Sequence, residues 1–274
     1  MTGEPTPLLI GGAASNATGV AWSPLARRLA VSVQQRQVGE RFGGGDIVVL
    51  DSTGIPESSV DRDQPDVVLD APAWLPSGEV VYARQVVGTP DAEARVEASL
   101  PDGSARRLLA SSARLPGVSP DGSRLAYLQP GPSGGQLVSL DLTTGSLTRL
   151  VDAASLGYAY FGAPRFSPDG HRIAFGASGG PAGPGTFSRL GLIAAPRVHG
   201  PNWDLWVMNA VGSGLRQATI IPEGDDLNAA WSPDGQWLAA YGPPGLYLVP
   251  AFTPGPTTPI AGGGSGEPDW LTSF

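Results

Sequence analysis

The sequence predicts an all-β fold, a β-propeller built from four-stranded antiparallel blades. One phrase returns along the chain, in which an aromatic or branched residue precedes a Ser-Pro-Asp-Gly turn and a short apolar strand. The phrase returns at intervals of 39 to 65 residues, which brackets the length of a propeller blade. No segment shows a sustained helical period, so the repeat indicates strands rather than helices.

The Ser-Pro-Asp-Gly phrase has the residue order of a type I turn, with Ser first, Pro second and Gly fourth. It occurs in full from Ser119, Ser167 and Ser232, and in degenerate form after the first two anchors. We expect the residue before each turn to pack between neighbouring blades. These equivalent anchors are Trp22, Trp74, Val118, Phe166, Trp231 and Trp270.

The third repeat shows the order of strands within one blade. After the turn comes a second strand at 124–127, and then an apolar third strand at 136–141. A glycine turn at 144–145 leads to a more polar fourth strand at 147–150. Units of this kind divide the chain into repeats at about 19–70, 71–114, 115–162, 163–227 and 228–262.

Two terminal segments, residues 6–10 and 268–274, are left over, and each has the pattern of one strand. The first and fourth strands of a blade run in opposite directions, so these segments can pair and close the ring. We therefore expect a single domain over 1–274, a six-bladed ring whose partial sixth blade is formed by the termini. A plain five-bladed ring is the alternative.

Composition excludes several classes of protein. The chain has 274 residues and a net charge of −8, so we expect no nucleic-acid partner. The absence of cysteine excludes disulfides and cysteine-based zinc sites. No apolar run is long enough to span a membrane, and the N-terminus lacks the pattern of a signal peptide. We expect a monomer that carries no cofactor.

The repeat resembles the WD-repeat-like unit of TolB-type propellers. That family's phrase, an aromatic residue and Ser-Pro-Asp-Gly followed by Arg-Ile-Ala-Phe, is matched at 166–175 and closely at 118–127 and 231–240. The resemblance covers nearly the whole chain. It implies a propeller fold, a protein partner and an extracytoplasmic location, either periplasmic or at the cell surface. The motif residues form turns and core, so the resemblance speaks for fold more strongly than for function.

The lengths of the connections predict which face of the propeller is functional. Connections from the first to the second strand, and from the third to the fourth, are short apart from 52–65. The long connections all belong to the opposite face, where binding residues on a rigid scaffold usually lie. Neutral drift in loop length is the alternative. The long connections are 34–45, 85–94, 152–163, 179–203 and 220–228.

Aromatic and arginine side chains on these long connections are the candidate binding residues, because such side chains are enriched in protein interfaces. They equally suit loops that pack against the blades. The candidates are Arg41, Phe42, Tyr158, Tyr160, Phe161, Phe187, Arg189, Arg197, His199 and Trp203. Glu223, Asp225 and Asp226 form an acidic trio whose oxygens suit calcium, although a solvated loop is the commoner role of such a run.

Signals for catalysis are few. The chain has two histidines, and its two Gly-x-Ser-x-Gly matches at 131–135 and 176–180 lie between predicted strands, where a nucleophile elbow cannot form. No catalytic residue is assigned. We expect a non-catalytic scaffold that recognises a protein partner through the face with the long connections. A carbohydrate- or peptide-active enzyme with its site at the propeller mouth is one alternative, and an extracytoplasmic sensor domain of a larger protein is another.

Overall fold

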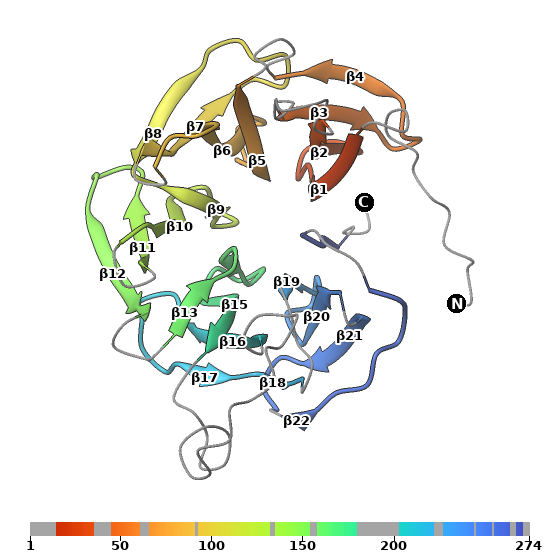
Figure 1. The fold of residues 1–274 in the computed structure, drawn as a ribbon, viewed down its shortest axis with the longest axis vertical. Helices are drawn as coiled ribbons and strands as arrows, with labels where there is room; N and C mark the ends of the chain where they lie inside the picture. Colours follow the sequence, from red (N-terminus) through yellow and green to blue (C-terminus); the bar gives the residue numbers. More distant parts are fainter. Residues whose placement is uncertain are drawn as a thin grey trace.

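The computed structural model is a ring of five antiparallel blades around a central axis, with a C-terminal segment between blade five and blade one (Figure 1). The all-β propeller that the repeat predicts is confirmed. The structure describes residues 15–35, 45–60, 66–90, 93–131, 135–153, 158–179, 203–221, 227–243, 245–253, 255–263 and 267–270. Within these ranges, no helix has the length and apolar character needed to cross a membrane.

The strands of blades one to three follow one another in chain order from the centre to the rim (Figure 1). Blade one contains β1 (Ser15–Trp22), β2 (Arg28–Gln35), β3 (Gly45–Asp51) and β4 (Pro56–Ser59). Blade two contains β5 (Val67–Trp74), β6 (Val80–Val86), β7 (Arg95–Ser99) and β8 (Arg107–Ser111). Blade three contains β9 (Arg114–Val118), β10 (Arg124–Gln129), β11 (Gln136–Asp141) and β12 (Leu147–Asp152).

Blades four and five depart from this regular order. The inner position of blade four is divided, because β13 (Tyr158–Phe161) and β14 (Arg165–Phe166) both pair with β15 (Arg172–Gly179). The blade continues with β16 (Trp203–Asn209) and β17 (Arg216–Gln217). Blade five contains β19 (Asn228–Trp231), β20 (Trp237–Gly242) and β21 (Gly245–Pro250). A parallel pair, β18 (Thr219–Ile220) and β22 (Gly255–Pro256), joins the two blades at the rim.

The hydrophobic core is divided into clusters that lie between adjacent blades. Alternate residues of a strand point to opposite faces of its sheet, so each blade packs against both neighbours. Tyr82, Leu69 and Ile47 are fully buried between blades one and two, and Phe175, Ile173 and Leu137 between blades three and four. The fold therefore depends on contacts between successive repeats, as expected of a repeat protein.

Two of the predicted anchors, Trp74 and Trp231, are structurally equivalent, and the hydrogen bonds of their indole groups show it. The Trp74 Nε1 donates a hydrogen bond of 2.9 Å to the carbonyl of Ala21, which precedes the anchor of blade one. Trp231 makes the same 2.9 Å bond to the carbonyl of Arg165, which precedes the anchor of blade four. Each of these tryptophans thus ties its own blade to the preceding one, and both are buried.

The C-terminal segment takes the place of the inner strand of a sixth blade. Trp270 repeats the anchor bond, donating from Nε1 to the carbonyl of Ala230 over 3.2 Å. On the other side, the Glu267 N–H donates to the carbonyl of Thr18, and the Trp22 N–H donates to the Asp269 carboxylate over 2.7 Å. These bonds link blade five to blade one. The other residues predicted for the sixth blade, 6–10 and 271–274, lie outside the described residues.

The inner strands of the first three blades carry β-bulges. Register shifts occur in β1 between Ala17 and Gly19, in β5 between Asp70 and Ala73, and in β9 opposite the step from Ala126 to Leu128. In β5 and β9, the bulges include Ala71 and Leu115, each with φ of 51°. Non-glycine residues rarely adopt positive φ, and bulges often re-aim side chains near functional sites.

Candidate binding face

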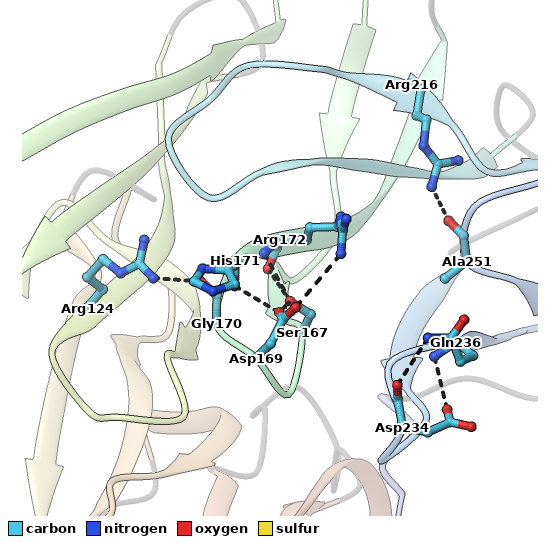
Figure 2. A network of polar contacts seen from close by, with 10 residues as sticks. All are labelled: Arg124, Ser167, Asp169, Gly170, His171, Arg172, Arg216, Asp234, Gln236 and Ala251. Atoms are coloured by element: carbon cyan, nitrogen blue, oxygen red, sulfur yellow. Dashed lines mark hydrogen bonds and ion pairs between the residues drawn. The ribbon is translucent and has the colours of Figure 1, made fainter.

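On the face that carries the Ser-Pro-Asp-Gly turns, the short-turn face, the turn residues bond to one another. In the turn of blade four, the Ser167 Oγ donates to Asp169 over 2.5 Å and accepts from the Arg172 N–H over 2.9 Å (Figure 2). The Gly170 N–H donates to the carbonyl of Ser167 over 2.8 Å, which closes the predicted turn. The same bonds recur from Ser119 and from Ser232.

The carboxylates of these turns are held in the charged state. The hydroxyl of Ser119 and the N–H of Ser123 donate to Asp121 and lower its pKa to about 2. The corresponding hydroxyl bonds lower the pKa of Asp169 and of Asp234. These aspartates therefore act as turn acceptors throughout the ordinary pH range.

Arginines connect neighbouring blades on the same face. Arg124 of blade three donates to the carbonyl of Gly170 in the turn of blade four over 2.6 Å (Figure 2). Arg216 of blade four donates to the carbonyl of Ala251 beyond blade five (Figure 2). All 17 basic residues of the chain are arginines, and a planar group with five N–H donors suits this bridging role better than an ammonium group.

A cavity of about 250 Å³ opens into the central channel at the short-turn face. It is lined by anchors and turn prolines of blades one to three, together with Arg165 and Asp269. Arg165 forms an ion pair with Glu267 and donates to the carbonyl of Pro116 over 3.2 Å. Asp269 accepts from the Trp22 N–H. The charged groups of the channel thus hold the C-terminal segment in the ring.

The opposite face, the long-loop face, lies where β2, β6, β13, β15 and β16 meet the long connections. A second cavity of about 330 Å³ opens here among blades one, two and three. Its polar lining comprises Gln34, Asp70, Gln85 and Arg114. The hydroxyls of Thr18 and Ser32 each lie 2.9 Å from the same oxygen of Asp70.

Asp204 is the second notable carboxyl group of the long-loop face. It stands at the start of β16, where its Oδ1 accepts from the Thr219 hydroxyl over 2.9 Å and from the Ile221 N–H over 2.8 Å. Its Oδ2 accepts from the Gln217 amide over 2.9 Å. Burial raises the pKa of Asp204 to about 6, and these hydrogen bonds only partly offset the effect. Asp204 thereby anchors β17, β18 and the start of the next connection.

The structure places three of the predicted binding residues at the long-loop ends of strands in blade four, and one more within its core. The backbone of Tyr158 and Tyr160 belongs to β13, and Trp203 is partly exposed at the start of β16. Phe161 is 3% exposed and packs edge-on against Phe175 with 5.5 Å between ring centres. Its side chain therefore belongs to the core, because the divided inner strand turns it between blades three and four.

The other candidates lie outside the described residues. These are Arg41, Phe42, Phe187, Arg189, Arg197 and His199, and also the acidic trio Glu223, Asp225 and Asp226. Among the described residues, no group of three or more histidine, aspartate or glutamate side chains is placed to hold a metal ion.

Sequence reasoning missed Asp70, Arg114 and Asp204, which the fold brings to the long-loop face. Asp70 and Arg114 belong to no sequence motif. They line one cavity only because the fold places the bulged inner strands of two blades side by side. Asp204 begins an apolar strand in the pattern Asp-Leu-Trp-Val-Met, and a carboxylate at the loop end of a buried strand was the one signal available.

The structure is a β-propeller with a closed ring, and its fold is similar to that of several solved proteins. A TolB structure from Agrobacterium tumefaciens superposes with a TM-score of 0.59 at 20% identity, covering 87% of this chain and 72% of the other. TolB from Acinetobacter baumannii gives 0.57 at 18% identity, covering 85% of this chain and 51% of the other. A gluconolactonase from Xanthomonas campestris gives 0.55 at 17% identity, covering 87% and 73%.

The chain therefore has the fold of a TolB-type β-propeller, as its repeat predicts. It spans about half the length of the Acinetobacter protein. No protein-family model and no curated protein sequence matches the chain. At these identities the likeness concerns the fold, which is shared by proteins that bind and by proteins that catalyse.

Proposed function

We propose that this propeller is a non-catalytic binding scaffold that recognises a protein partner through its long-loop face. The observation that carries the proposal is the unequal construction of the two faces. Polar groups of the short turns bond within the turn or to the next blade. On the other face, the strand ends lead into the long connections, and a cavity there is lined by polar side chains. Recognition surfaces typically occupy such loops on a rigid scaffold.

The channel favours binding over catalysis. A catalytic mouth would need convergent polar groups that remain available to a substrate. Arg165, Glu267 and Asp269 converge there, but Arg165 pairs with Glu267 and bonds to the inner strand of blade three, and Asp269 bonds to the inner strand of blade one. Their role in closing the ring accounts for their presence. The gluconolactonase among the similar structures makes hydrolysis at the mouth the competing function. The third alternative, a sensor role, requires a further domain.

The TolB structures also support an extracytoplasmic location. Fractionation of the source cells with an antibody to this chain tests it. Recovery with the periplasmic or surface fraction is expected, and recovery with the cytosol alone would contradict the proposal.

A loop replacement tests the binding face. In β15 and β16, Ser178 pairs with Trp203, so the strand ends are adjacent. An Asn-Gly dipeptide can therefore replace 180–202, which leaves a three-residue hairpin loop together with Gly179. Both chains are immobilised and exposed to a lysate of the source cells. Arg107→Gln serves as the matched control, because it changes an exposed ion pair with Glu79 on the outer strand of blade two.

A specific protein captured by the intact chain and by the control, but not by the loop-replaced chain, is the expected result. Equal capture by all three chains would show that another surface recognises the partner. Capture of no protein, combined with hydrolysis of a lactone or glycan panel by the intact chain, would favour the enzymatic alternative.

A further inference from the structure

The cavity of the long-loop face has the composition of a small-molecule site. Its volume of about 330 Å³ lies at the lower end of the range of ligand pockets, which is about 300–1,000 Å³. Gln34 comes from blade one, Asp70 and Gln85 from blade two, and Arg114 from blade three. Val68 and Leu115 contribute apolar walls. Three blades therefore bring a carboxylate, a guanidinium group and two amides around one small volume.

The carboxylate of Asp70 is held in a fixed orientation. Thr18 and Ser32 both approach its Oδ1 at 2.9 Å, and the two hydroxyl oxygens lie 2.5 Å apart. Among the described residues, these are its hydrogen-bond partners, so Oδ2 retains its capacity to accept. A carboxylate positioned in advance, with one oxygen engaged and the other available, suits a cationic donor from a ligand.

Arg114 offers the complementary group. It is the first residue of β9, opposite Leu128, at the loop end of the inner strand. A guanidinium group has five N–H donors, so a contact made elsewhere leaves donors for a ligand carboxylate. Arginine binds carboxylates in a bidentate manner, which fixes the orientation of the ligand as well as its charge.

The backbone around the cavity is strained at the residue that follows each of the two charged residues. Ala71 follows Asp70, Leu115 follows Arg114, and each has φ of 51° within a β-bulge. Positive φ at non-glycine residues costs free energy and is concentrated at ligand sites. The same distortion occurs in two neighbouring blades, immediately after the two residues of opposite charge that line the cavity.

We propose that this cavity binds a free α-amino acid with an aliphatic side chain. The ligand ammonium group donates to Asp70, its carboxylate accepts from Arg114, and its side chain lies against Val68 and Leu115. The two glutamines supply further polar contacts. The site lies on the same face as the protein-partner surface proposed above, but the inference does not depend on that surface, because it requires only the described residues of blades one to three.

Isothermal titration calorimetry with the full chain tests the proposal. L-Leucine carries both charges, isoamylamine lacks the carboxylate, and 4-methylpentanoate lacks the ammonium group. We expect L-leucine to bind with a Kd below about 1 mM, and each of the other two compounds at least about tenfold more weakly. Comparable binding of isoamylamine would instead show a simple cation site, and lack of leucine binding would overturn the proposal.

Variants test the residues. Asp70→Asn and Arg114→Gln should each weaken leucine binding at least about tenfold. Asp66→Asn and Arg95→Gln remove the same charges at exposed positions outside the cavity and should leave the Kd unchanged. Because Asp70→Asn alters a buried contact with blade one, Val87→Trp provides a second test that obstructs the cavity from a partly exposed position.

Thermal melting in the absence of ligand verifies that each variant is folded. Loss of binding in Asp70→Asn, Arg114→Gln and Val87→Trp, with retention in both controls, supports the site. Retention of leucine binding in Val87→Trp and Arg114→Gln would place the ligand elsewhere and overturn the assignment.

Discussion

The short-turn face and the long-loop face belong to the same blades but use their polar residues differently. On the short-turn face, Ser167 and Asp169 bond to the backbone of their own turn, and Arg124 bonds to the turn of the next blade. On the long-loop face, Asp70 lies within β5 and lines a cavity, and Asp204 lies at the start of β16 and bonds to Ile221, which precedes a long connection. The comparison teaches that repeated residues in this chain mark the fold, whereas residues that differ between repeats mark the candidate site.

The largest expected effect comes from the anchor of blade five. Trp231→Ala removes a buried indole and its bond to blade four, so we expect a loss of about 3–5 kcal/mol in the free energy of unfolding. Urea denaturation measures this loss. Trp237→Ala is the matched control, because Trp237 is 41% exposed and should cost less than about 1 kcal/mol. A loss below about 1 kcal/mol for Trp231→Ala would mean that the anchor register is wrong.

A smaller effect is expected at the closure of the ring. Trp270 is only partly buried, so Trp270→Ala should cost about 2–3 kcal/mol, and Trp270→Phe, which removes the indole donor but keeps an aromatic ring, about 1 kcal/mol. Denaturation curves of both variants supply the two values. If Trp270→Ala unfolds at the same urea concentration as the parent chain, the C-terminal segment does not act as the inner strand of a sixth blade.

A comparable loss of stability, with a local cause, is expected for a substitution in one of the short turns. Ser232→Ala removes the hydroxyl that accepts from the Trp237 N–H and donates to Asp234, and we expect a loss of about 1–2 kcal/mol. Thermal denaturation at neutral pH measures it. An unchanged melting temperature would show that the turn is held by its backbone bond alone.

A further effect, which depends on pH, is expected on the long-loop face. The pKa of Asp204 is raised to about 6 in the folded chain, against an ordinary value of 3.8, so the folded state binds the proton more tightly than the unfolded state. The stability that Asp204 contributes is therefore full below about pH 4 and is lost as the pH rises through about 6. Asp204→Asn should remove this dependence, which melting temperatures across that range measure. An identical pH profile in the two chains would contradict the raised pKa.

Much of the fold could be predicted from the sequence, because the turn phrase repeats and its chemistry is local. A Ser, a Pro, an Asp and a Gly in order suffice to form the turn, and Trp74 and Trp231 occupy equivalent positions as their spacing indicates. For the candidate site, the sequence predicts the face of the propeller but not the residues that line the cavity. The sequence allows Phe161 either to bind a partner or to pack against the blades, and in the structure its side chain is buried at the divided inner strand of blade four. Asp70 and Arg114 lie beside β-bulges in two different blades, and no local sequence pattern predicts these bulges.

The loop-replaced chain provides the most direct test of the division between the two faces. If the short turns and anchors maintain the fold, replacing 180–202 by an Asn-Gly turn between Gly179 and Trp203 should shift the melting temperature by no more than about 2–4 °C, the shift that about 1 kcal/mol produces in a domain of this size. Differential scanning calorimetry of the two chains measures the shift. A fall of more than about 10 °C would contradict the account, because the long connection would then be part of the folding core.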